Sequence, residues 1–208
     1  MAKHDNLSEA CVLEAFRIIE SDGVDNLSLR AVSRRLGVSH QAPYKHFESR
    51  DHILAEVVRR TFDRFAKYLE QHPTTDDPHA DMRTLGEGYL QYAIENPAHY
   101  RLMFGTVLPP ANKHPSMMKS AQKPFLMLTD CVERVWQMHG VSPNPKAVQL
   151  DALFIWSSMH GMASIMQTTV MDTLKLPQDV LDTMTDHAMF RISRSIGYEA
   201  DSPDYLPE

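Results

Sequence analysis

The chain has 208 residues, 43% of them hydrophobic, and a formal net charge of −6 at pH 7. A chain of this length and composition can bury a core and form one small and one larger helical unit. No run reaches the roughly 20 apolar residues of a membrane span, and the N-terminus is polar, so we expect neither a membrane span nor a signal peptide.

The first predicted helix covers residues 6–23. Apolar side chains recur there at intervals of three and four residues, at Val12, Ala15, Phe16 and Ile19. Gly23 ends the pattern, because glycine is the usual residue just past a helix. We expect this helix to brace the two that follow it.

A short second helix is predicted from Ser28 to Leu36. The Ser28 hydroxyl can accept a hydrogen bond from the free amides of the first turn. Gly37 follows where a helix end favours a residue that tolerates positive φ. The helix is therefore expected to stop in a tight glycine turn.

A third helix is predicted over residues 40–47, with Ser39 as its cap and Phe47 as its apolar anchor. Pro43 lacks an amide hydrogen and predicts a distorted first turn or a shifted cap. Two short helices joined by a glycine turn are typical of a DNA-binding helix-turn-helix, here at residues 28–47.

The charge distribution favours a nucleic-acid partner at this motif. Residues 30–67 carry nine Lys or Arg against four Asp or Glu, although the whole chain is acidic. Polar side chains of the predicted helix over residues 40–47 suit base edges, whereas Arg30, Ser39 and Arg50 suit phosphate. The predicted DNA-binding residues are Arg30, Ser39, His40, Gln41, Tyr44, Lys45, His46 and Arg50. The later basic residues Arg59, Arg60, Arg64 and Lys67 are interpreted as a solvated helix face.

The rest of the chain also predicts helices. Prolines and capping residues place them at residues 50–71, 78–95, 97–105, 116–139, 145–171 and 177–197. Pro124 is expected to kink or interrupt the helix that contains it. No strand pattern is visible, so the predicted fold class is all-α.

The predicted organisation has two functional regions. An N-terminal three-helix helix-turn-helix domain, residues 1–50, is joined by a long helix to a C-terminal helical ligand-binding and dimerisation domain. That second domain is predicted over residues 51–198, and residues 199–208 are predicted to be a frayed tail.

The C-terminal region is rich in Met and aromatic residues. Flexible thioethers and rings can line an adaptable apolar pocket, and His160 could donate to a ligand. For any single member of this set, packing in the core is the commoner role. The predicted ligand-binding residues are Met103, Phe104, Phe125, Trp136, Phe154, Trp156 and His160.

The last two predicted helices favour self-association. Residues 147–171 are apolar on too many sides to face one core. On the final helix, apolar residues lie three and four positions apart, at Leu181, Met184, Ala188 and Ile192. We therefore expect both helices to pair with their copies about a two-fold axis.

Two segments carry a family resemblance. The sequence L-S-L-R-A-V-S-R-R-L-G-V-S, followed by A-P-Y-K-H-F, resembles the tetracycline-repressor (TetR) family of one-component bacterial regulators. The segments Gly88–Phe104 and W-S-S-M-H-G (Trp156–Gly161) resemble the subgroup with a Trp…His-Gly signature. The resemblance implies a homodimer that binds palindromic DNA and a C-terminal domain that holds an inducer, with repression as the usual outcome.

Other chemistry lacks a motif. The eleven histidines include no pair at i, i+4 spacing and none beside a cysteine at finger spacing, so no metal site is predicted. Cys11 and Cys131 fit no C-x-x-C pattern and are expected to be buried thiols in a reducing cytoplasm. Nucleophile elbows, phosphate loops and dinucleotide fingerprints are absent from the sequence, so no enzyme activity and no cofactor are expected.

The sequence thus predicts a DNA-binding transcriptional repressor, a homodimer released from a palindromic operator by a small apolar or amphipathic effector. Two alternatives stay open. One is an all-helical small-molecule binding protein or enzyme whose helix-turn-helix is only a packing unit. The other is an architectural DNA-binding protein that senses no ligand.

Overall fold

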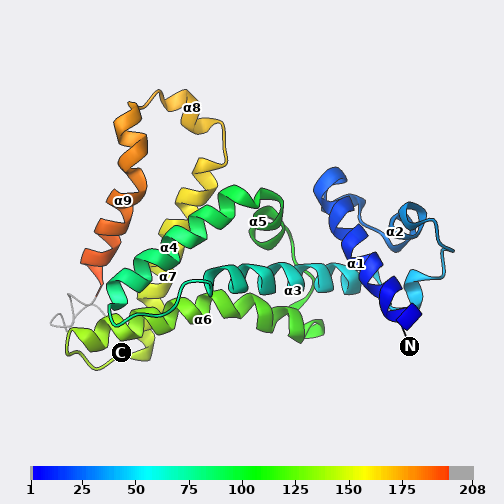
Figure 1. Cartoon of the computed structure of the whole chain (residues 1–208), viewed down its shortest axis with the longest axis horizontal. Coiled ribbons are helices and arrows are strands. Elements are labelled where there is room, and N and C mark those ends of the chain that lie inside the picture. The colour runs from blue at the N-terminus through cyan, green and yellow to red at the C-terminus, as the bar shows by residue number, and fades with distance from the viewer. Residues whose placement is uncertain (1, 197–208) are drawn as a thin grey trace. The chain divides into compact units, whose positions relative to one another are not determined.

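The computed structural model describes residues 2–196, and residues 2–6 by their backbone alone. Within this range every regular element is an α-helix or a 3₁₀-helix, which confirms the predicted all-α class (Figure 1). The predicted tail, residues 199–208, lies outside the described residues. No helix in the described range is both long enough and apolar enough to cross a membrane.

The helices form two compact units. The first unit contains the chain up to Ala66 together with Ala98–Lys123. Its elements are α1 (Ala2–Asp22), η1 (Val24–Asn26), α2 (Leu29–Leu36), η2 (Pro43–Lys45), most of α3 (Arg50–Leu69), α5 (Pro97–Phe104), η3 (Ala111–Lys113) and the start of α6 (Pro115–Met138). α1 begins at Ala2, so the predicted start at residue 6 is wrong.

Apolar side chains of α1, α2 and α3 form the core of the first unit. Ala15, Val32, Ile53 and Val58 have no exposed surface at all. α1 packs against α2 and η1, as the sequence pattern predicts for a bracing helix (Figure 1). Burial of this kind is the main favourable term in holding three short helices together.

The second unit contains Lys67–Pro97 and the chain from Pro124 onward. Its elements are the end of α3, α4 (Pro78–Glu95), the rest of α6, α7 (Pro145–Met166), α8 (Val170–Leu174) and α9 (Gln178–Ser195). α6 continues through Pro124, so the predicted interruption is absent. The predicted helix over residues 145–171 is instead divided into α7 and α8, because Thr168 and Thr169 are poor helix formers.

Helices α4, α7 and α9 pack together in the second unit (Figure 1). A Cβ atom at Gly86 of α4 would collide with the thioether of Met189 on α9, so this glycine permits the close approach of the two helices. Ile192 is 4% exposed, and Leu181, Met184 and Ala188 are half-buried. Of the α9 face predicted for dimer contacts, Ile192 is thus buried within its own unit and the other three residues keep some exposed surface.

His99 of α5 connects α5 to α1 within the first unit. Its ring stacks on Phe16 with the ring centroids 4.3 Å apart and an interplanar angle of 20°. Burial, and then the positive charge of Arg64, lowers the pKa of His99 from 6.5 to about 4. The ring is therefore neutral in the folded protein at neutral pH.

Acidification should destabilise the protein through His99. Between pH 6.5 and pH 4 the unfolded chain binds a proton that the folded chain rejects, so stability present above pH 6.5 is lost as the pH falls. The expected loss from this group is about 2 to 3 kcal/mol at about pH 4.5. Urea unfolding of the wild type and of His99→Phe, at about pH 7.5 and about pH 4.5, measures it. The variant keeps an aromatic stack and should lose less stability on acidification; equal losses would contradict the assignment.

Candidate functional site

The glycine turn of the predicted motif is built as the sequence suggests. The Ser28 hydroxyl accepts a hydrogen bond from the amide of Ala31 at 3.0 Å and caps α2. Gly37 ends α2 at φ 66°, a left-handed conformation that disfavours side chains. The amides of Gly37 and Val38 donate to carbonyls in the last turn of α2, which fixes the direction of the following segment.

The segment after the turn differs from the predicted α-helix over residues 40–47. Residues 40–42 form a turn, and Pro43–Lys45 form the 3₁₀-helix η2. The amides of Ala42, Lys45 and His46 each donate to the carbonyl three residues earlier. Pro43 has no amide for the carbonyl of Ser39, so an α-helical start is blocked and the distortion predicted from proline extends over the whole segment.

This segment presents polar side chains to solvent. Pro43 and Phe47 are buried and anchor it. Tyr44 is 47% exposed, and Gln41 and Lys45 are exposed beside it. The arrangement offers a phenol, an amide and a positive charge from a firmly anchored turn.

The other residues predicted to contact DNA differ in their exposure and in their neighbours. Arg30 and Ser39 are exposed. His40 is exposed, and its Nδ1 lies 3.2 Å from the hydroxyl of the buried Ser33, which links the turn to α2. His46 is half-buried with its ring 6.4 Å from that of Phe47.

Arg50 is engaged inside the first unit. Its Nε donates to the carbonyl of Leu27 at 3.1 Å, and its Nη2 donates to the carbonyl of Val24 at 2.8 Å. Nη1 lies 3.6 Å from the carboxylate of Asp51. The guanidinium therefore fixes the start of α3 against η1.

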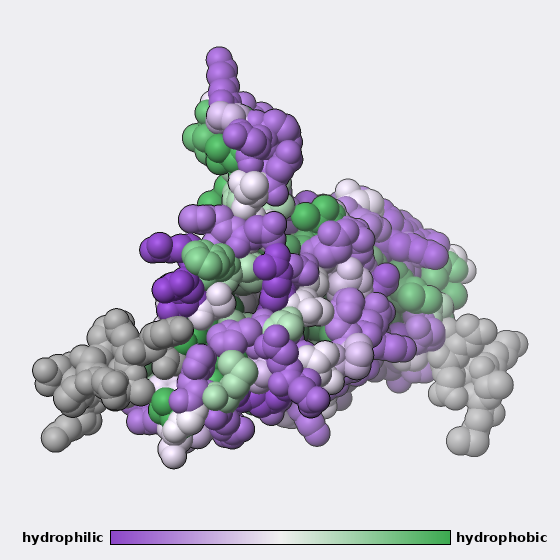
Figure 2. Space-filling model, turned by 60° about the vertical axis from the view of Figure 1, so that its left-hand side comes forward, coloured by the Kyte–Doolittle hydropathy of each residue, from purple (hydrophilic) through white to green (hydrophobic). Residues whose placement is uncertain are grey.

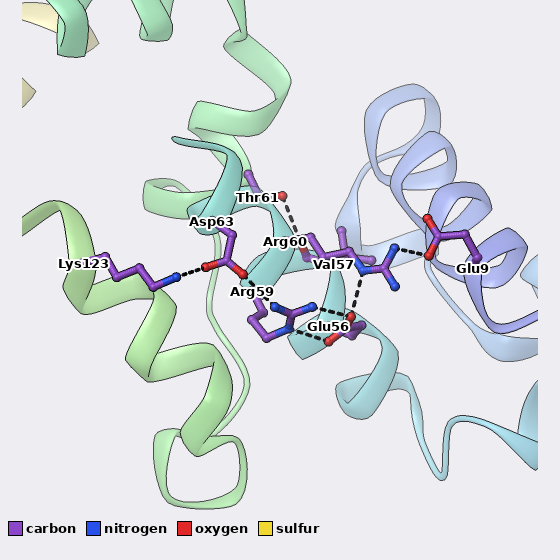
Figure 3. Close-up of polar contacts among 8 residues, drawn as sticks. All are labelled: Glu9, Glu56, Val57, Arg59, Arg60, Thr61, Asp63 and Lys123. Atoms are coloured by element: carbon purple, nitrogen blue, oxygen red, sulfur yellow. Dashed lines mark hydrogen bonds and ion pairs between the residues drawn. The ribbon is translucent and has the colours of Figure 1, made fainter. Parts of the chain in front are cut away.

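A line of charged side chains crosses the first unit, from α1 through α3 to α6 (Figure 3). In order of contact it contains Glu9, Arg60, Glu56, Arg59, Asp63 and Lys123. We call this set the ion-pair chain. The basic residues at positions 59 and 60 are thus engaged with carboxylates.

The distances within the ion-pair chain are short. The Glu56 carboxylate accepts hydrogen bonds from Arg59 at 2.7 and 2.8 Å and from Arg60 at 2.8 Å. Hydrogen bonds from Arg59 hold the pKa of the Glu56 carboxyl below its usual value. Burial opposes ionisation of Asp63, but hydrogen bonds from Lys123 and Ser120 leave its pKa lowered as well. Each pair is partly exposed, so the expected contribution per pair is about 0.2 to 1 kcal/mol.

The predicted ligand-binding residues do not gather in one place. Met103 is buried, and Phe104 packs in the first unit with its ring 5.9 Å from Phe62 and 5.0 Å from Tyr100. In the second unit, Trp136 donates from its indole nitrogen to Asp151 at 2.9 Å. Phe154 is 49% exposed on α7.

Three predicted residues do meet in the second unit. Trp156 lies between Phe125 and His160, with ring centroids 6.1 and 6.2 Å away. His160 Nδ1 is 3.1 Å from the hydroxyl of Tyr89 on α4. Burial lowers the pKa of His160, which favours the neutral ring.

A cleft of about 300 Å³ lies elsewhere in the second unit, and sequence patterns gave no signal for it. Its wall combines the end of α3, the following linker, α4 and α6. The lining residues are Leu69, Glu70, His72, Pro73, Thr74, Asp81, Thr84, Leu85, Met127, Asp130, Cys131 and Arg134. None of the predicted ligand-binding residues is among them.

Polar contacts brace the wall of the cleft. Arg134 donates to Asp81 and to the carbonyl of Thr75, each at 2.6 Å. The thiol of Cys131 lies 3.5 Å from the carbonyl of Pro78, and burial raises the pKa of Cys131 to about 12. The thiol is therefore protonated at neutral pH and inert as a nucleophile.

Comparison of the sequence with known families gives two matches. Residues 13–57 match the family described as bacterial regulatory proteins, tetR family, and residues 82–191 match the tetracyclin repressor-like C-terminal domain. An HTH-type transcriptional regulator of Staphylococcus aureus (strain USA300) is 28% identical over 87 residues, which is 40% of this chain and 46% of that protein. The chain thus aligns with about half the length of the curated relatives it matches.

Solved structures share the fold over almost the whole chain. A protein of unknown function from Rhodococcus sp. RHA1 has a TM-score of 0.75 at 23% identity, covering 92% of this chain and 95% of that one. The fatty acid degradation regulator FadR from Bacillus halodurans has a TM-score of 0.61 at 13% identity, covering 91% and 94%.

Proposed function

The chain belongs to the TetR family of bacterial regulatory proteins, and we propose that it is a transcriptional repressor that acts in the bacterial cytoplasm. Members of this family are DNA-binding transcriptional regulators rather than enzymes. The proposed active form is a homodimer on a palindromic operator. A small amphipathic effector would release it from DNA. We propose residues 1–50 for DNA binding and residues 51–198 for effector binding and dimerisation.

The observation that carries the DNA-binding proposal is the anchored, polar turn after Gly37. Exposed Gln41, Tyr44 and Lys45 can reach base edges in a major groove, whereas Arg30 and Ser39 suit phosphate. His40 and His46 flank these groups and are proposed as further contacts. Arg50 is proposed to hold the motif in position.

Replacing the exposed reading residues should weaken operator binding without unfolding the protein. We expect Lys45→Ala and Tyr44→Ala each to cost about 1 to 3 kcal/mol, because a lost base contact is worth that much. Electrophoretic shifts at fixed salt, on an operator found by footprinting, measure the change. Lys119→Ala is the matched control, since Lys119 is also exposed in the first unit. Full operator affinity in both variants would contradict the assignment of these residues. Failure of the wild type to retain any specific DNA would favour the small-molecule binding alternative.

We propose that α7 carries the dimer interface. Leu150, Phe154 and Ile165 lie on one face of this helix, and each is 45 to 49% exposed. Gly161 lies on the same face, and a Cβ there would meet no atom within 4 Å. Apolar side chains beside a glycine suit close packing against a second copy of the helix. Figure 2 shows apolar side chains on an otherwise largely polar surface of the molecule.

Gly161→Leu should weaken the dimer. The open space at this position lets the monomer accept the side chain, but a partner helix in close contact could not. Sedimentation velocity across a dilution series should show a dissociation constant raised at least about tenfold, roughly 1.4 kcal/mol. Gln149→Leu adds the same side chain at an exposed position off this face and should leave the dimer intact. A wild-type monomer at micromolar concentration would contradict the dimer itself.

We propose that the effector binds in the cleft of the second unit. Its volume lies at the lower end of the range for small-molecule sites, about 300 to 1,000 Å³. Leu69, Leu85 and Met127 supply apolar wall. The cleft holds three carboxylates, those of Glu70, Asp81 and Asp130, against the single guanidinium of Arg134. Trp156 and His160, outside the cleft, are the second candidate position.

The charge of the cleft favours an amphipathic amine as the effector. Arg134 is already engaged by Asp81, so a fatty acid would place its carboxylate in a cleft with an excess of negative charge. Calorimetry with an alkylamine and the fatty acid of equal chain length should show binding of the amine alone. The operator should weaken amine binding by the same factor by which the amine weakens the operator, about 5 to 150-fold.

A matched pair of variants locates the effector. Thr84→Trp fills the cleft and should abolish the response to the amine while operator binding is retained. Trp156→Leu should leave the response unchanged. The opposite pattern would move the effector to the aromatic group, and equal amine affinity with and without operator would refute the allosteric step.

A further inference from the structure

Two histidines that are 60 residues apart in sequence meet in the second unit. His79 lies in the first turn of α4, and His139 directly follows the end of α6. Their Nε2 atoms are 3.1 Å apart. The two rings are 5.3 Å apart at 70° to each other, so the nitrogens face one another at an angle rather than stacking.

We propose that this pair is a binding site for zinc or another late divalent transition metal. A metal ion bound to both Nε2 atoms at about 2.0 to 2.1 Å would subtend an angle of about 100° between them, close to a tetrahedral arrangement. Imidazole is a preferred ligand of zinc, copper and nickel. Residues 7–196 contain no group of three or more His, Cys, Asp or Glu side chains that could hold a metal, so the proposed site has two protein ligands and would need water for the others.

The backbone that carries each ring is held by local hydrogen bonds. The Asp77 carboxylate accepts hydrogen bonds from the amides of His79 and Ala80, which caps α4 at the turn that carries the first ring. The amide of His139 donates to the carbonyls of Val135 and Trp136, and Gly140 then ends the helix at φ 74°. A preformed site of this kind loses little freedom when it binds a metal.

The second nitrogen of His79 leaves Nε2 as the atom that can reach a metal. Nδ1 is enclosed and has no hydrogen-bond partner among residues 7–196, whereas Nε2 faces His139. A metal would tie the start of α4 to the end of α6, the helices that supply Asp81 and Arg134 to the cleft.

Calorimetric titration of metal-stripped protein with zinc tests the proposal. The wild type should bind one zinc per chain, and His79→Gln and His139→Gln should each bind it at least about tenfold more weakly. His114→Gln is the matched control, because its ring also lies near another histidine, His52, but with the centroids 6.2 Å apart. This variant should bind zinc like the wild type. Zinc affinity equal in all four proteins, or lost in the control instead, would overturn the site.

Copper(II) gives a readout that does not depend on affinity alone. Electron paramagnetic resonance of the protein with one equivalent of copper should show coupling to two imidazole nitrogens. Each single variant should show one. Circular dichroism establishes that the variants are folded, and a wild-type spectrum without two-nitrogen coupling would refute paired coordination.

Discussion

The start of α3 depends on one side chain that bonds to two backbone carbonyls. Arg50 donates to Val24 and Leu27, the residues at the beginning and end of the short segment between α1 and α2. Val24 opens the 3₁₀ turn η1 and Leu27 caps it, and the Val24 carbonyl also accepts a hydrogen bond from the amide of Leu27. A planar guanidinium can donate to both carbonyls in one fixed geometry, which the flexible ammonium of a lysine does not impose. Through this contact the helix-turn-helix and the long helix α3 form one packed body.

The ion-pair chain orients the helices that carry it more than it stabilises the fold. Its pairs are partly exposed, so each contributes little alone, and the buried apolar residues supply most of the free energy of folding. Arg59 and Arg60 share Glu56, so the side chains constrain each other over two turns of α3. The basic excess of this region in the sequence therefore overstates the charge that can contact DNA, and the positive charges proposed for DNA are Lys45 on the turn and Arg30 on α2.

Local signals in the sequence predicted most of the helices. They could not predict which distant segments come together to form a site. Helices with explicit caps, such as those begun by Ser28, Asp77 and Asn144, start where the sequence predicts, because a cap acts on the residues next to it. The segment at residues 40–47 departs from the prediction, since one missing amide at Pro43 outweighs helix propensity. The cleft and the facing histidines are formed by segments far apart in the chain, and periodic sequence patterns do not predict contacts between such segments.

Coupling between DNA binding and effector binding requires elements that belong to both compact units, and α3 and α6 are such elements. α3 begins at Arg50 in the helix-turn-helix and ends at Leu69 in the wall of the cleft. α6 carries Lys123 of the ion-pair chain and then, past Pro124, the cleft residues up to Arg134. A helix transmits a displacement along its length because its backbone hydrogen bonds resist bending. In the proposed mechanism, a ligand that shifts the end of either helix would act on contacts that hold the helix-turn-helix, without any contact of its own with DNA.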